Sequence, residues 1–218
     1  MTLFARFQRA GGRSSAGYSL IELSIALSIL AVIIVGSLIG VQKILRTNAV
    51  NNELKGLPET LAAAQRLTSN LSDLSGLNTT TFTKLGVWPQ DRVKGTTSSD
   101  GKSSTSSVSN FFGGQQYLNP NSSSLAGADA NQLFVLTLTN IPTEACADIV
   151  SGMDRMALGL YVGANTDTDP AGVVAKTVVK DPGTASTAAG RSANLSTLSG
   201  LCGAAGGGRI RLDMLVSR

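Results

Sequence analysis

The sequence contains no histidine and few charged or aromatic residues. Without an imidazole there is no histidine base or ligand, which excludes Ser-His-Asp hydrolases and most zinc sites. Charged residues make up 15% and aromatic residues 5%, whereas Gly, Ser, Thr and Ala are plentiful. This composition favours a loop-rich extracytoplasmic domain over a cytosolic enzyme. A length of 218 residues allows one globular domain with an appendage.

The formal net charge is +4, but the basic excess lies in one short segment. Arg6, Arg9 and Arg13 precede Tyr18 with no acidic residue among them. Removing residues 1–17 leaves 15 of the 18 basic residues against 14 acidic ones, so the remaining chain is nearly neutral. The basic residues therefore indicate a targeting segment, and we predict no nucleic-acid partner.

A charge-free apolar run follows this basic segment. From Leu23 to Val41 it reads LSIALSILAVIIVGSLIGV, without a proline. As a helix it extends about 28 Å at ~1.5 Å per residue, close to the hydrocarbon thickness of a bilayer. The preceding arginines favour a cytoplasmic N-terminus, although Lys43 and Arg46 on the other side weaken this orientation.

The small residues that suit a cleavage site precede the apolar run instead of following it. An ordinary secretory signal is cleaved behind its apolar segment, and no convincing small-residue site occurs there. Residues 14–17 read SSAG and residues 18–22 read YSLIE. Cleavage after Gly17 would remove the basic leader and keep the apolar helix as the new N-terminus.

This arrangement resembles the type IV pilin family, in which a prepilin peptidase cleaves after a glycine and methylates the new amino terminus. The family keeps a glutamate as the fifth mature residue. The resemblance implies cleavage between Gly17 and Tyr18, N-methylation of Tyr18 and an assembly role for Glu22. The 17-residue leader, the mature length of 201 residues and the Tyr18 start resemble the type IVb branch. The specific match covers residues 14 to 45.

Glu22 has a physical meaning apart from the family. A carboxylate at the bilayer centre is unfavourable by up to ~3 kcal/mol, so an acid in an apolar span usually marks a partner. We predict that Glu22 pairs with the Tyr18 ammonium of an adjacent subunit; the alternative is an interfacial glutamate without a partner. Gly36 and Gly40 form a GxxxG pattern, which permits either close helix packing or local melting.

The helical pattern continues beyond the apolar run and becomes amphipathic. Apolar residues recur every three or four positions from Val50 to Leu74. Gly56 and Pro58 predict a kink or short break, with the helix restarting at Pro58. A dedicated coiled coil is the rival interpretation.

Strand patterns follow in the second half of the chain. Alternating residues predict one-sided strands at 134–139 and 209–216, and shorter strands at 157–162 and 173–179. Residues 142–144 begin a helical pattern that carries Cys146. The sum predicts an α+β pilin fold, in which a long N-terminal helix with a transmembrane first half packs on an antiparallel sheet.

The predicted organisation has four parts: a leader at 1–17, a transmembrane or filament-core helix at 18–42, an amphipathic helix at 43–75 and a globular head at 76–218. Two segments of the head, 95–110 and 181–208, are rich in small polar residues and glycine and are expected to be exposed loops.

The two cysteines, Cys146 and Cys202, allow one intrachain pairing. In an exported protein they would close a loop of about 57 residues, worth roughly 3 to 5 kcal/mol in the chain-entropy model. The alternative is two buried thiols in a cytosolic core. The membrane segment favours export, so we predict a disulfide that bounds the C-terminal region of the head.

Other patterns do not support a chemical site. Gly101-Lys102-Ser103 ends like a phosphate loop but lacks its first glycine and preceding strand. The segment 165–176 has calcium-loop spacing at its start, but a proline replaces the turn glycine and a lysine the bidentate acid. Trp88 and the Phe111-Phe112 pair are interpreted as core anchors beside turns. We predict no catalytic residue, cofactor or metal.

We therefore expect a subunit that resides in the inner membrane and is then polymerised by pilus assembly machinery into a surface homopolymer. Adhesion, aggregation, motility and conjugation are all open as roles of that filament. The alternatives are a secretion-system pseudopilin, and a minor pilin or tip adhesin. A membrane-tethered enzyme or binding module is the alternative from another class.

Overall fold

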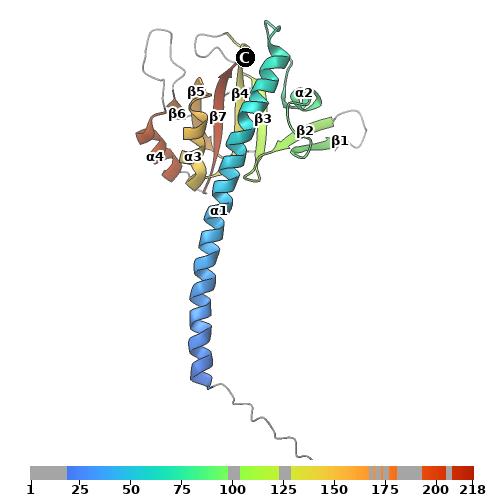
Figure 1. The fold of residues 1–218 in the computed structure, drawn as a ribbon. Helices are drawn as coiled ribbons and strands as arrows, with labels where there is room; N and C mark the ends of the chain where they lie inside the picture. Colours follow the sequence, from blue (N-terminus) through green and yellow to red (C-terminus); the bar gives the residue numbers. More distant parts are fainter. Residues whose placement is uncertain are drawn as a thin grey trace, which may run out of the picture. The chain divides into compact units, whose positions relative to one another are not determined.

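One long helix begins the described part of the chain, and shorter helices and an antiparallel sheet follow it (Figure 1). The computed structural model describes residues 19–97, 104–122, 129–166, 169, 173, 177–180, 193–204 and 208–218. Two compact units are distinguished, Met1–Lys43 and Ile44–Arg218. The elements run in the order α1 (Leu20–Thr68), α2 (Thr79–Lys84), β1 (Val93–Thr97), β2 (Ser104–Ser109), β3 (Gln115–Pro120), β4 (Leu133–Pro142), α3 (Thr143–Met153), β5 (Gly159–Ala164), β6 (Thr177–Lys180), α4 (Leu195–Ala204) and β7 (Arg209–Ser217).

The strands form one sheet in the order β1-β2-β3-β4-β7-β5-β6, with every neighbouring pair antiparallel. The last strand in the sequence, β7, lies between β4 and β5. Met214 on β7 is opposite Leu136 on one side and Leu160 on the other. The predicted α+β class with an antiparallel sheet is confirmed.

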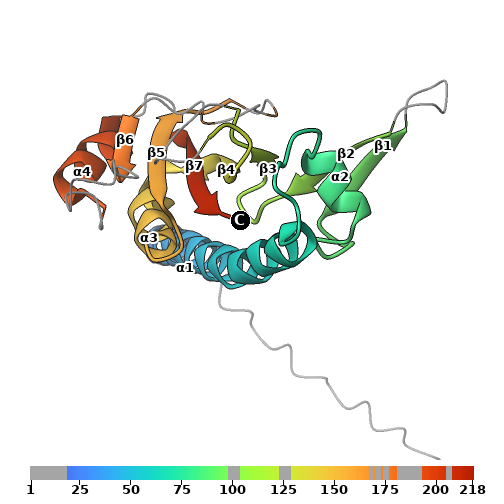
Figure 2. The same cartoon turned by 90° about the horizontal axis from the view of Figure 1, so that it is seen from above.

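Within the second unit, α1 packs across one face of this sheet (Figure 2). Val50, Leu57, Leu61 and Ala64 are each at most 5% exposed and share a core with the strands. Their spacing of three, four and seven residues puts them on one side of the helix. Burying such a leucine contributes about 1.5 to 3 kcal/mol, so this stripe holds the helix on the sheet.

The helix is continuous through Gly56 and Pro58. Of the expected kink or short break, the break is therefore wrong, and the kink stays a prediction. Proline removes one backbone donor from a helix, but the surrounding turns are held by tertiary packing. Leu57 and Leu61 on either side of Pro58 are buried in the core. The Thr60 hydroxyl also donates to the Gly56 carbonyl at 3.1 Å.

The helix ends at Thr68, earlier than the pattern to Leu74 predicted. The following segment folds into turns because its polar side chains bond the backbone locally. Asp73 accepts hydrogen bonds from the backbone N–H and the hydroxyl of Ser75, at 2.8 and 2.9 Å. Leu74 is fully buried without being helical, and its N–H donates to the carbonyl of Asn131 at 3.0 Å.

The strands β4 and β7 are buried on both faces, so the prediction of one-sided strands is wrong. Arg211 and Asp213 alternate with the apolar residues of β7 and are only 1% and 0% exposed. Arg211 Nε lies 2.9 Å from Asp213 Oδ1, and the Thr137 hydroxyl donates to the same oxygen at 2.7 Å. Mutual pairing allows these polar groups to be buried.

The two segments predicted as loops contain regular structure. Residues 95–110 contribute to the β1 and β2 hairpin, although 98–103 lie outside the described residues. Of residues 181–208, the part from 195 to 204 forms α4, and 181–192 and 205–207 are not described. The shorter predicted strands are found as β5, which is shifted by two residues, and as β6, which covers the end of its predicted range.

The predicted Cys146–Cys202 disulfide is present and joins α3 to α4, with the two Cα atoms 5.7 Å apart. The expected helix around Cys146 is confirmed as α3. A second connection runs from Lys180 on β6, whose Nζ donates to the Asp154 carbonyl at 2.6 Å and lies 3.2 Å from its carboxylate. Both connections hold the C-terminal region of the head together.

Trp88 and Phe111 were both expected to be core anchors, and the structure confirms this for Trp88 only. Trp88 is 2% exposed and belongs to the core, as predicted. Phe111 is 45% exposed, so it is not a core anchor. Its ring instead covers the guanidinium of Arg92, whose Cζ lies 4.7 Å from the ring centroid.

A buried ion pair joins α1 to the strand side of the head. Glu53 is fully buried, and its carboxylate accepts from Arg92 Nη2 at 3.1 Å and from the Phe111 N–H at 3.0 Å. Arg92 also donates to the Ser109 carbonyl and to the side chain of Gln116, both at 2.9 Å. Burial raises the pKa of Glu53, and the charge of Arg92 opposes this shift.

We expect the Cys146→Ala/Cys202→Ala double variant to lose about 3 to 5 kcal/mol of unfolding free energy, because the unfolded chain regains the freedom that the disulfide removes. Trp88, the single tryptophan, lies in the core and reports unfolding in denaturant by fluorescence. The reduced wild-type chain is the matched control and should show the same loss. Free thiols in the exported protein would contradict the bond.

We expect Arg92→Leu to destabilise the head by about 3 to 5 kcal/mol near neutral pH, because an uncompensated carboxylate is left buried. A raised pKa means that the folded state binds the Glu53 proton more readily than the unfolded state, whose pKa is near 4.5. The contribution of Glu53 to stability is therefore greatest below pH 4.5 and is lost as the pH rises through the folded pKa.

The loss of stability with rising pH should be larger in Arg92→Leu than in the wild type, because the charge of Arg92 no longer opposes the raised pKa of Glu53. Denaturant unfolding in acidic and neutral buffer measures the difference. Lys94→Leu, at an exposed position two residues away, is the control and should change little at either pH. Equal losses in both buffers would show that Arg92 acts through packing alone.

Candidate assembly surface

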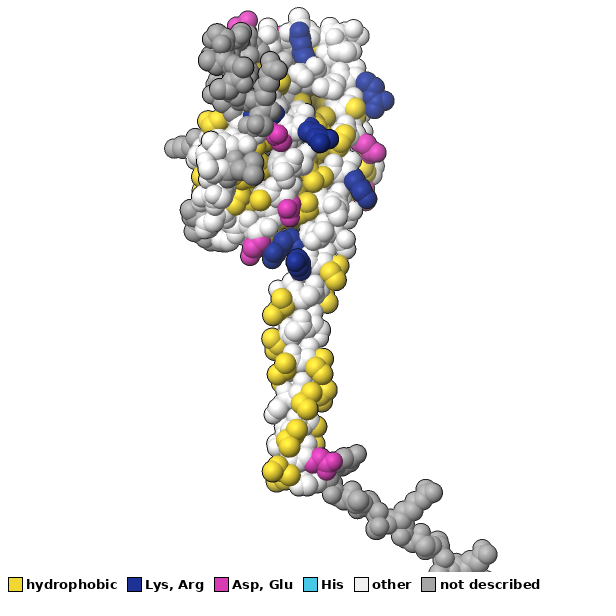
Figure 3. Space-filling model, turned by 60° about the vertical axis from the view of Figure 1, so that its left-hand side comes forward, with side chains coloured by type: hydrophobic (Ala, Val, Ile, Leu, Met, Phe, Trp, Pro, Cys, Tyr) yellow, Lys and Arg dark blue, Asp and Glu magenta, His cyan; other side chains and the backbone are white. Residues whose placement is uncertain are grey.

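The first half of α1 leaves its large apolar side chains uncovered. Between Leu20 and Leu45 these side chains are 51 to 85% exposed, and consecutive residues such as Ile33, Ile34 and Val35 are all among them. Figure 3 shows hydrophobic side chains along this part of the helix. A helix that is apolar on all sides is stable only in lipid or among other apolar helices.

The three serine hydroxyls within this segment are satisfied inside the helix itself. The hydroxyls of Ser24 and Ser28 donate to the carbonyls of Ile21 and Ser24, each at 2.8 Å, and that of Ser37 donates to the Ile33 carbonyl. The most apolar stretch has a mean hydropathy of 2.6, and α1 is long and apolar enough to cross a membrane. Internal hydrogen bonding is what a hydrocarbon environment requires.

Glu22 lies in the first turn of α1 and is exposed. A carboxylate in the first turn is favoured by the unpaired N–H groups at the start of a helix. It forms no ion pair with any residue that the structure describes. Gly17 and Tyr18, the predicted cleavage and methylation positions, lie outside the described residues, so the predicted pairing stays a prediction.

Gly36 and Gly40 lie four residues apart on one side of α1, which is helical through both. A Cβ atom added at either position would meet no atom within 4 Å. This side of the helix is therefore open to the close approach of another helix. Local melting of the helix around these glycines in an assembly is untested.

The segment with calcium-loop spacing does not gather its described side chains at one point. Asn165 Oδ1 accepts from the Asn140 N–H, and Asp169 Oδ1 accepts from Asn119 Nδ2, both at 2.6 Å. Asp167 and residues 101–103 of the phosphate-loop pattern are not described. Within the described ranges, no group of three or more potential metal-ligating acidic or cysteine side chains occurs.

Sequence reasoning missed the two buried charge pairs. Glu53 follows Val50 by three residues and precedes Leu57 by four, so its position in the apolar stripe was a signal of burial. Arg211 and Asp213 carry no comparable signal, because alternating charges on a strand are typical of a solvent-facing side.

Comparison with known proteins gives both family and fold. The family model described as PilS N terminal matches residues 46–198, and the prokaryotic N-terminal methylation motif matches residues 12–38. No curated protein sequence matches the chain. The crystal structure of a type IV b pilin from Salmonella typhi is similar at 20% identity and a TM-score of 0.48, covering 77% of this chain and 99% of that one.

The crystal structure of TcpA, a type IV pilin from the Vibrio cholerae El Tor biotype, is similar at 15% identity and a TM-score of 0.53. That match covers 78% of this chain and 99% of TcpA. At this identity the likeness shows a shared fold.

The PilS match spans more than half of the chain, and the methylation motif includes Gly17, Tyr18 and Glu22. The chain belongs to the PilS family and is a type IV pilin, a structural subunit and not an enzyme.

Proposed function

We propose that this pilin is the major subunit of a type IVb-like pilus, held in the inner membrane by α1 until assembly machinery moves it into a helical homopolymer. The observation that carries the proposal is the exposed apolar half of α1, which has no covering surface within the described chain. Lipid covers it before assembly. The same segments of other subunits cover it in the filament.

The hydrophobic effect does not drive this transfer, because lipid tails are as apolar as the helices that replace them. Close packing and polar pairing between helices must therefore supply the preference for the filament. The open side at Gly36 and Gly40 permits close packing. Glu22 supplies a polar group whose pairing depends on a neighbouring subunit.

We infer that a prepilin peptidase cleaves between Gly17 and Tyr18 and methylates the new amino group, which then meets Glu22 of an adjacent subunit. A pair of opposite charges in an apolar environment is favourable only when the two groups are in register. The pairing thus selects one axial stagger. Since the contact joins different surfaces of identical chains, repeating it generates an open helical polymer.

The head is carried on the outside of this polymer and supplies the surface that meets the environment. Adhesion, aggregation, motility and conjugation are all compatible with such a surface. A pseudopilin and a minor pilin share the N-terminal segment and differ in abundance within extended filaments.

Mass spectrometry of sheared surface filaments tests processing and abundance together. We expect the chain to be the predominant protein and to begin at a methylated Tyr18, because the leader is removed before assembly. Matched membrane fractions from cells without the peptidase should contain the chain with residues 1–17 intact. Scarcity in filaments favours a minor pilin, and an intact leader in assembled filaments contradicts the proposal.

Glu22→Ala tests the pairing. We expect a chain that is processed and membrane-resident but at least about tenfold less abundant in filaments, since losing a charge pair of ~1.4 kcal/mol or more changes an equilibrium tenfold. Immunoblots of sheared filaments and membranes measure the two pools. Glu59→Ala removes an exposed acid further along the same helix and should assemble normally. Normal assembly of Glu22→Ala would refute the pairing.

A further inference from the structure

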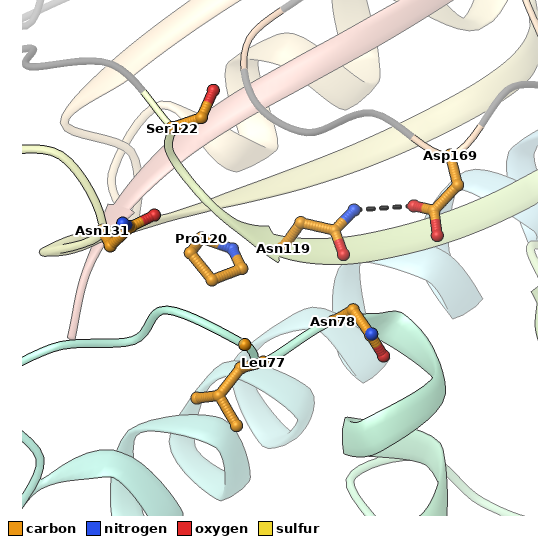
Figure 4. A pocket seen from close by; sticks show the side chains of 8 residues that line it. Leu77, Asn78, Asn119, Pro120, Ser122, Asn131 and Asp169 are labelled. Carbon is orange, nitrogen blue, oxygen red and sulfur yellow. Dashed lines mark hydrogen bonds between the residues drawn. The ribbon is translucent and has the colours of Figure 1, made fainter.

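A polar pocket opens where the segment before α2, the end of β3 and the turn before β4 meet (Figure 4). Its volume is about 370 Å³. Leu77 and Pro120 contribute apolar surface, and the remaining side chains used below are neutral amides, a hydroxyl and one carboxylate. All lie within the unit Ile44–Arg218, and none belongs to α1.

Two buried residues, Asn119 and Thr79, orient the exposed carboxylate of Asp169 in this pocket. Asn119 is 5% exposed, and its Nδ2 donates to Asp169 Oδ1 at 2.6 Å. The Oδ1 of Asn119 in turn accepts from the backbone N–H of Thr79 at 3.0 Å. Thr79 is 1% exposed, and its hydroxyl oxygen accepts from the Leu118 N–H at 3.1 Å. The carboxylate is therefore oriented before any ligand arrives, which lowers the entropy lost on binding.

Two hydrogen bonds fix the backbone of Asn131. It has a φ of 60°, its N–H donates to the Asn121 carbonyl at 2.7 Å, and its own carbonyl accepts from Leu74 at 3.0 Å. Asparagine is one of the few residues that adopt this left-handed conformation readily. Its carboxamide makes no hydrogen bond to any residue in the described part of the chain.

Several hydrogen-bonding groups of the pocket are left uncommitted. Asn78 uses its Oδ1 to cap α2 at Thr81, at 2.9 Å, and this leaves its Nδ2 available. The Ser122 hydroxyl and Asp169 Oδ2 form no hydrogen bond to a described residue. Together with the Asn131 carboxamide, the pocket offers both donors and acceptors.

This mixture of hydrogen-bond donors and acceptors favours one class of ligand over others. The lining residues that the structure describes include a carboxylate and no cation, which disfavours phosphate, sulfate and carboxylate ligands. The described side chains leave three oxygen-bearing groups uncommitted, on Ser122, Asn131 and Asp169, which is few for calcium with its six to eight oxygen ligands. Sugar hydroxyls each donate and accept, and the apolar faces of Leu77 and Pro120 suit the C–H face of a sugar ring.

We propose that this pocket binds a neutral saccharide, with Asp169 accepting hydrogen bonds from its hydroxyl groups. The volume lies near the lower limit of small-molecule sites, which matches one or two sugar rings better than an extended peptide. Charge-assisted hydrogen bonds are about twice as strong as neutral ones, so Asp169 is the group on which affinity depends most. A filament would repeat this weak site in every subunit and gain avidity.

The test uses the full chain, purified from membranes in a detergent without a sugar headgroup. The probe is an array of neutral and sialylated oligosaccharides, and the strongest neutral binder is then titrated calorimetrically. We expect binding of a neutral saccharide that is unaffected by added salt, because no ion pair is broken. Asp169→Ala should weaken it at least tenfold, and Asp169→Asn, which keeps an acceptor for Asn119, should weaken it less.

Asp148→Ala removes an exposed acid on α3 and is the matched control, with unchanged binding expected. Equal thermal melting of all variants excludes unfolding as the cause of a loss. The proposal is overturned if no neutral saccharide binds, if binding is confined to sialylated probes and falls with salt, or if Asp169→Ala binds like the wild type. None of these outcomes depends on whether filaments form.

Discussion

The rest of the structure depends on one continuous helix that meets two different environments. The part of α1 between Leu20 and Leu45 keeps its large apolar side chains exposed, whereas from Val50 onward a stripe of the same helix lies in the core of the head. Because an α-helix satisfies its backbone groups internally, this segment can exchange lipid for protein without leaving hydrogen bonds unmade. A sheet or loop at this place would have no such freedom.

The head secures the second part of α1 by polar contacts as well as by burial. Glu53 is bound to Arg92, and the Gln65 side chain donates to the Ser217 carbonyl at 2.9 Å. Arg218 donates to the carbonyls of Leu71 and Ser72, at 2.7 and 2.9 Å, just beyond the end of the helix. The strand β7 thus lies inside the sheet, between β4 and β5, and residues at its end also bind α1 and the turn that follows it.

The sequence predicts the apolar N-terminal helix well and the head less well, for physical reasons. An uninterrupted apolar run has few alternative structures, and Cys146 and Cys202 had a single possible pairing. In contrast, the Ser- and Thr-rich strand β2 has no apolar alternation to distinguish it from a loop. The pocket proposed to bind a saccharide joins Asn78, Asn119, Asn131 and Asp169, which are far apart in sequence, so no local pattern could indicate it.

Two glutamates on the same helix show how the partner determines the role of a charge. Glu53 is buried and paired with Arg92 of the same head, so its partner is supplied within a single chain. Glu22 lies at the other end of α1 and forms no ion pair with the residues that the structure describes. A carboxylate already neutralised within its own chain gains nothing from a neighbour. In the proposed filament, an acid without such a partner would be favourable in an apolar environment only beside a correctly placed amino group, and this dependence would allow the proposed membrane anchor to set the subunit register.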